Sequence, residues 1–70
     1  MGKIISPMDG KILEIKVKVG DQINSGDEVI VLEAMKMELP IIAEESGTVR
    51  EIVCNKGDSV RTGETLIIYD

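Results

Sequence analysis

The sequence contains no histidine, phenylalanine or tryptophan, and it has a single cysteine and a single tyrosine. Cys54 therefore cannot form an intramolecular disulfide, and it lacks a histidine or second cysteine for a metal site or a Cys–His nucleophile. We expect Cys54 to be a small packed or half-exposed residue. A chain without disulfides favours a reducing compartment, so the predicted location is the cytoplasm.

Positive charge and long apolar runs are also scarce. Lysine and arginine total 8 against 13 acidic residues, which gives a formal net charge of -5. Nucleic acids and anionic membrane surfaces both require clustered cations, so neither is an expected partner. No apolar stretch approaches the roughly 20 residues of a membrane-spanning helix, so membrane insertion is not expected. A chain of 70 residues buries only about 60% of its unfolded surface, which favours a carrier, binding or structural module over an independent enzyme.

The chain consists largely of one pattern written twice. Residues 9–33 align without a gap with residues 46–70, at a constant offset of 37. Because glycine tolerates positive φ, glycines that coincide under such an offset indicate two half-domains with the same backbone geometry. The coinciding pairs are Gly10 with Gly47, Gly20 with Gly57, and Gly26 with Gly63.

Each half has the pattern of short strands. Residues 11–19 alternate between apolar and polar side chains from Leu13 onward, which is the period of a half-buried strand. Residues 48–53 are the equivalent strand of the second half. Nearly continuous apolar runs, as expected of strands deep in a small sandwich, lie at residues 29–32 and 66–69.

Turns punctuate these strands, and no segment carries a helical stripe of adequate length. Residues 24–27 and 61–64 contain the glycine and small polar residues typical of tight turns. The predicted fold class is all-β, a flattened β-barrel or sandwich of two four-stranded sheets with a quasi-two-fold internal repeat (a barrel-sandwich hybrid). It is expected to occupy residues 1–70 as a single domain.

The segment between the two halves contains an unusual turn. If residues 29–34 and 37–42 are strands, the chain reverses at Met35 and Lys36. Two-residue hairpin turns normally contain Asn-Gly or Asp-Gly, because their central residues require positive φ. Local rules are broken more often at functional sites than elsewhere. Lys36 is therefore the candidate functional residue, although most turn lysines are simply solvated.

The residues around Lys36 resemble a known motif. The sequence Glu-Ala-Met-Lys-Met-Glu at residues 33–38 is similar to the biotin attachment motif of biotin carboxyl carrier proteins and of biotinyl domains in biotin-dependent carboxylases and decarboxylases. Residues 6–10 resemble the family's opening Pro-Met-x-Gly, and residues 46–49 resemble the small-Gly-x-Val stretch that follows the attachment hairpin. The resemblance covers essentially the whole chain.

This resemblance implies a function and a set of site residues. Lys36 would receive covalent biotin from a biotin protein ligase. The biotin would then carry carboxyl groups between a biotin carboxylase and a carboxyltransferase or decarboxylase subunit, and the domain would be a carrier with no catalytic residues and no metal. The residues that would frame Lys36 are Glu33, Ala34, Met35 and Met37.

The first half lacks a feature of one subgroup. The carriers of bacterial acetyl-CoA carboxylase have an extra "thumb" loop, whereas residues 9–21 here align with residues 46–58 without a gap. The chain therefore resembles the thumbless biotinyl domains of other carboxylases and decarboxylases, or a stand-alone biotin/lipoyl attachment protein.

Three alternative functions stay open. A lipoyl domain of a 2-oxoacid dehydrogenase-type complex has a lysine at the same hairpin, but Asp typically precedes it and Ala follows it, where this chain has Met35 and Met37. An unmodified barrel-sandwich binding module, as in membrane fusion proteins, usually has a long helical insertion at the hairpin. A small enzyme would have to rest on carboxylates, which are dispersed along the chain.

Overall fold

A computed structural model describes residues 2–70, in which every regular element is a β-strand. No helix that could cross a membrane occurs within these residues. Met1, which belongs to the single domain predicted over residues 1–70, lies outside the described residues. The strands are β1 (Gly2–Ile5), β2 (Gly10–Ile15), β3 (Gln22–Ile23), β4 (Glu28–Ala34), β5 (Met37–Ile42), β6 (Gly47–Ile52), β7 (Ser59–Val60) and β8 (Thr65–Tyr69).

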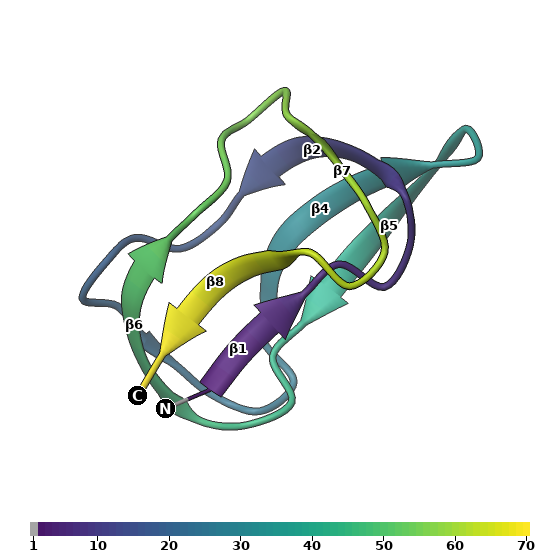
Figure 1. Ribbon diagram of the computed structural model, residues 1–70. Coiled ribbons are helices and arrows are strands. Elements are labelled where there is room, and N and C mark those ends of the chain that lie inside the picture. The colour runs from purple at the N-terminus through teal and green to yellow at the C-terminus, as the bar shows by residue number, and fades with distance from the viewer. Residues whose placement is uncertain (1) are drawn as a thin grey trace.

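The strands form two four-stranded antiparallel sheets that pack face to face (Figure 1). One sheet has the order β1-β8-β6-β3 and the other has the order β5-β4-β2-β7. The predicted all-β sandwich is confirmed. The sheets are not the two halves of the repeat, because β3 of the first half pairs with β6, and β7 of the second half pairs with β2.

An aliphatic core fills the space between the sheets. Successive side chains of a strand point to opposite faces, so every second side chain points inward. Fully burying a large aliphatic side chain contributes about 1.5–3 kcal/mol. The single aromatic residue, Tyr69, is also buried, and its hydroxyl donates a hydrogen bond to Glu45 Oε1 at 2.9 Å. The largest fully buried side chains include Ile12, Ile23, Ile30, Leu32, Leu66 and Ile67.

The quasi-two-fold repeat predicted from the glycines is present in the backbone. The N–H of Gly20 donates to the carbonyl of Val49, and the N–H of Gly57 donates to the carbonyl of Ile12. The glycine turn of each half is therefore hydrogen-bonded to a strand of the other half. Both hydrogen bonds obey the offset of 37. Four glycines have positive φ in matched pairs: Gly20 (95°) with Gly57 (92°), and Gly26 (96°) with Gly63 (86°).

The strand predicted over residues 11–19 is shorter than its sequence pattern. The ladder ends at Ile15, so the prediction was wrong for the last four residues. The turn at Gly20 engages the backbone of Lys18, because Asp21 Oδ2 accepts a hydrogen bond from the Lys18 N–H at 2.9 Å and the Asp21 N–H donates to the Lys18 carbonyl. Val19, the last apolar residue of that alternating pattern, is 63% exposed.

One carboxylate ties the first half to a turn of the second half. Asp9 Oδ1 accepts hydrogen bonds from the backbone N–H of Thr62 at 2.8 Å and from its hydroxyl at 3.0 Å. The backbone bond, followed by the hydroxyl bond, lowers the pKa of Asp9 below its ordinary value of 3.8. Because the folded-state pKa is lowered, the bonds stabilise the fold above the ordinary value, and that contribution disappears as pH falls through the lowered pKa.

We expect Asp9→Asn to lower the melting temperature at neutral pH, because the amide is a weaker acceptor than the carboxylate. The difference between the variant and the wild type should shrink as the pH falls below 3.8, the ordinary pKa of this carboxyl group. Thermal unfolding followed by circular dichroism between pH 2 and pH 7 measures both curves. A difference that is the same at every pH would show that charge on Asp9 does not matter.

Candidate attachment site

The chain reverses between β4 and β5 in a two-residue turn. Ala34 pairs with Met37, and the residues between them are Met35 and Lys36, with φ of 53° and 63°. Positive φ at both central positions defines the hairpin turn that Asn-Gly usually forms. The predicted hairpin and its unusual turn residues are thus confirmed.

The hairpin projects beyond the rest of the sandwich, at the end away from the two chain ends (Figure 1). The quasi-two-fold relation accounts for this placement. It relates the hairpin, which connects the two halves, to the region where the two chain ends lie side by side. Lys36 is therefore presented at one pole of the domain, clear of the strands that make up the core.

The side chains around Lys36 differ sharply in exposure. Met35 is 82% exposed and Met37 is 61% exposed, whereas Ala34 is only 4% exposed and belongs to the core. Ala34 therefore anchors the base of the hairpin, and the two methionines stand in solvent on either side of Lys36. Exposed methionine is a flexible apolar surface that adapts to a partner protein.

Charge around the turn is unbalanced. Glu33 and Glu38 pair directly across the two strands, and like charges in that arrangement destabilise a hairpin slightly. Lys36 is the one cation in the segment 33–38. Within residues 2–70 the ion pairs found join Lys16 with Glu28 and Arg50 with Asp70, so neither occupies Lys36.

An exposed primary amine at the apex of a well-defined turn can act as a nucleophile once it loses its proton. The turn fixes the direction of the amine, and the surrounding solvent leaves room for an enzyme's active site to enclose it. The arrangement suits a site of covalent attachment, because Lys36 is exposed to solvent.

The left-handed turn at Lys36 makes a prediction about stability. Left-handed φ costs a residue with a side chain about 1–2 kcal/mol, and a glycine in its place avoids that cost. The greater freedom of glycine in the unfolded chain offsets about 0.5–1 kcal/mol of this gain in stability. We therefore expect Lys36→Gly to raise the free energy of unfolding by about 0.5–1 kcal/mol while removing the amine.

Urea unfolding of Lys36→Gly measures this gain. The matched control is Lys56→Gly, because Lys56 is also an exposed turn lysine but does not have positive φ. The control should lose stability or keep it unchanged. If Lys36→Gly were less stable than the wild type, the side chain of Lys36 would be supporting the fold.

The other reactive groups of the described residues offer no competing site. Cys54 is buried, which is one of the two placements predicted for it, and its pKa is raised by burial and then by the nearby carboxylates of Asp58 and Glu64. A raised pKa keeps the thiol protonated and unreactive. No group of three or more acidic, cysteine or histidine residues placed to hold a metal ion occurs in residues 2–70.

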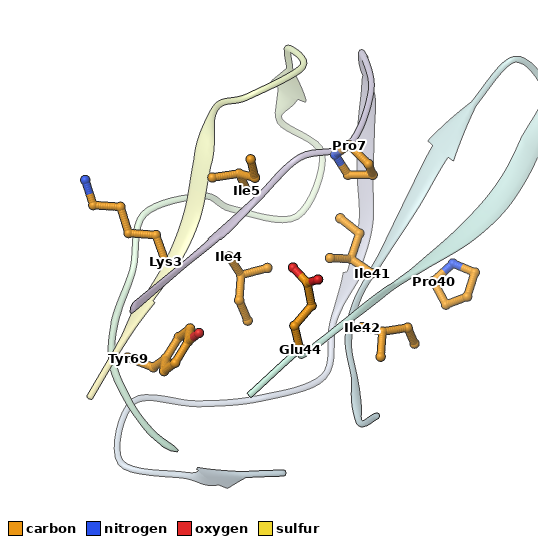
Figure 2. A pocket seen from close by; sticks show the side chains of 9 residues that line it. All are labelled: Lys3, Ile4, Ile5, Pro7, Pro40, Ile41, Ile42, Glu44 and Tyr69. Carbon is orange, nitrogen blue, oxygen red and sulfur yellow. The ribbon is translucent and has the colours of Figure 1, made fainter. Parts of the chain in front are cut away.

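A groove of about 430 Å³ lies away from the turn, between the edge strands β1 and β5 (Figure 2). Ile5 and Pro7 line it on one side, and Pro40 and Ile42 line it on the other. None of residues 33–38 lines this groove. Met35, Lys36 and Met37 therefore stand exposed on the projecting turn, outside this groove.

Comparison with known proteins supplies the family. A sequence model for the family described as "Biotin-requiring enzyme" matches residues 2–68, a span that includes the first half-repeat, the hairpin and all but the last two residues of the second half-repeat. The chain belongs to the biotin-requiring enzyme family. The family predicted from the motif at residues 33–38 is thereby confirmed.

Relatives of this biotin-requiring family member include small attachment proteins and parts of large enzymes. The chain is 48% identical over 60 residues to the biotin/lipoyl attachment protein of Bacillus subtilis (strain 168), covering 86% of this chain and 82% of that protein. It is 44% identical over 62 residues to the biotin carboxyl carrier protein of Streptococcus mutans, covering 89% of this chain and 48% of that protein.

Solved structures share the fold of this biotin-requiring family member. The urea carboxylase of Kluyveromyces lactis superposes with a TM-score of 0.91 at 33% sequence identity, covering 99% of this chain and 6% of that chain. The chain thus spans about half of the Streptococcus carrier protein and a small part of the urea carboxylase. The similarity to a biotin carboxyl carrier protein agrees with the predicted carrier function.

The five predicted site residues all lie on the β4–β5 hairpin: Glu33, Ala34, Met35, Lys36 and Met37. Their proximity follows from adjacency in the chain, and the structure adds that Ala34 is a core residue and not part of an exposed frame. Sequence reasoning treated Gly10 only as part of a repeat and an opening motif. The structure places Gly10 against the backbone of Glu33, at the base of the hairpin.

Proposed function

We propose that the chain is a biotin carboxyl carrier domain that is biotinylated on Lys36 and performs no bond-making chemistry on its substrates. It would present the modified side chain to a biotin carboxylase and then to a carboxyltransferase or decarboxylase partner. The observation that carries this proposal is the exposed amine of Lys36 at the apex of a projecting turn with left-handed φ at both central residues. Cytoplasmic location stays a prediction.

The residues of the hairpin fit an attached biotin. The amine of Lys36 would attack the carbonyl carbon of biotinyl-adenylate, forming an amide bond as the bond to the adenylate oxygen breaks, AMP leaves and the amine loses its proton. Met35 and Met37 would contact the ligase on either side of the amine. When bound, biotin supplies the ring nitrogen that accepts a carboxyl group, which is chemistry the protein side chains do not provide.

Attachment also changes the charge of the hairpin. An amide carries no positive charge, so the formal net charge of the chain would move from -5 to -6. The segment 33–38 would then hold the two glutamates without a cation. A basic surface on a partner enzyme would be attracted more strongly to the modified hairpin than to the unmodified one.

The test is intact mass after incubation of the folded domain with biotin, ATP and a biotin protein ligase. We expect one biotinyl increment and no more, and peptide mapping should place it on Lys36. The remaining lysines, which are also exposed, serve as internal controls: Lys3, Lys11, Lys16, Lys18 and Lys56.

Lipoate is the second candidate modification, because the relative from Bacillus subtilis is named as a biotin/lipoyl attachment protein. The same mass measurement with lipoate, ATP and a lipoate ligase distinguishes the two. A lipoyl increment in the absence of any biotinyl increment would replace the proposed function with lipoyl transfer.

A further inference from the structure

Gly10 begins β2 and lies against the end of β4 that leads into the turn. In the register of these strands Lys11 pairs with Glu33, so Gly10 lies one residue nearer the turn. A Cβ atom on Gly10 would stand 2.5 Å from the carbonyl oxygen of Glu33 and 3.0 Å from Cγ of Leu32. Real Cβ contacts essentially never fall below 3.0 Å, so the two backbones can lie this close only because residue 10 has no side chain.

We propose that Gly10 is a positioning residue for Lys36. Because Gly10 has no side chain, Glu33 can lie close to β2, and this close contact fixes the position of the hairpin base from which the amine of Lys36 projects. This inference rests on the proposed function. Met35 and Lys36 are exposed, so the position of the turn depends on the base of the hairpin. Lys36 follows Glu33 by three residues, and a displacement of the Glu33 carbonyl is carried along the strand to the amine.

Strand β2 cannot relieve the crowding by moving away from β4. On its other side Gly10 pairs with Val60 of β7. The next part of β2 is held by Ile12, whose N–H donates to the carbonyl of Asp58 and whose carbonyl accepts from Gly57. A side chain at residue 10 must therefore push Glu33, by about half an ångström at the least, to restore an ordinary contact distance.

The internal repeat provides a matched control for this effect. Gly47 is the equivalent of Gly10, and a Cβ atom on Gly47 would approach the carbonyl oxygen of Asp70 even more closely. Asp70 is the equivalent of Glu33 under the same offset of 37. Alanine at either glycine therefore crowds the same kind of backbone contact, but only the one at residue 10 adjoins the attachment hairpin.

The experiment compares wild type, Gly10→Ala and Gly47→Ala as substrates of a biotin protein ligase at saturating biotin and ATP. An excluded osmolyte such as trimethylamine N-oxide keeps the variants folded, and circular dichroism verifies it. A misplacement of 1 Å can cost on the order of 100-fold in rate. We therefore expect Gly10→Ala to lower kcat by about tenfold with a smaller change in KM, and Gly47→Ala to keep kcat within about twofold of wild type.

Amide chemical shifts give a second readout that a loss of stability alone would not move. In Gly10→Ala the resonances of Met35, Lys36 and Met37 should shift, and in Gly47→Ala they should stay in place. Equal kcat values for the two variants would overturn the inference, as would a Gly10→Ala chain that stays unfolded in the osmolyte. A wild type that receives no label would instead refute the proposed function.

Discussion

Replacing Lys36 with arginine is expected to abolish biotin attachment and to leave the stability of the domain almost unchanged. Arginine keeps the positive charge and the length of the side chain, but its guanidinium does not lose a proton in proteins and so cannot act as the attacking amine. The exposed position of Lys36 and its freedom from the ion pairs of residues 2–70 mean that no structural contact is lost.

Intact mass under ligase conditions measures the loss of attachment, and urea unfolding measures stability. Lys56→Arg is the matched control, since Lys56 is an exposed turn lysine and its replacement should leave the single biotinyl increment in place. An increment that persists in Lys36→Arg would assign attachment to another lysine. A fall of more than about 1 kcal/mol in the free energy of unfolding would exceed what a surface substitution normally costs and would indicate a structural role.

Two core substitutions are expected to have the largest effects on stability. Ile30 and Ile67 are both 0% exposed, lie on inner strands of the two sheets and are equivalent under the repeat. Isoleucine to alanine in a core costs about 2–5 kcal/mol, because the removed methyl groups leave a cavity. A domain of 70 residues has a total of only about 4–10 kcal/mol, so either variant should be close to unfolding at body temperature.

Urea unfolding of Ile30→Ala and Ile67→Ala measures these losses, which we expect to be similar because the two environments are equivalent. Ile68→Ala is the control, since Ile68 is half-buried on the outer face and should lose much less. A loss below 1 kcal/mol at Ile30 or Ile67 would mean that the core can close around the missing atoms. Biotin attachment in each variant should fall only in proportion to the unfolded fraction.

Stability and attachment make opposite demands on the turn. Glycine at residue 36 would relieve the left-handed backbone, yet only the lysine supplies an amine, so the sequence keeps a residue that costs stability at the place where the proposed function requires it. This conflict is what made the turn visible from sequence, because Met35 and Lys36 stand where hairpins usually have asparagine and glycine. Lys36 could therefore be singled out as the candidate attachment residue before any coordinates.

The sequence by itself determined the internal repeat, the all-β class and the hairpin with Lys36 at its apex, because all three depend on local chemistry. Glycines with positive φ mark the same turns in both halves, and the period of two in apolar residues marks the strands. The resemblance of residues 33–38 to the biotin attachment motif then indicated a function for Lys36.

Only the tertiary structure decided which strands share a sheet, where β2 ends and why residue 10 is glycine. The short strands β3 and β7 pair with strands of the opposite half, and two residues carry too little pattern to reveal a partner. The ladder of β2 stops at Ile15 because Asp21 binds the backbone of Lys18. Gly10 lies against the backbone of Glu33, which is distant in sequence. The apolar and polar pattern of the side chains does not reveal a contact of this kind.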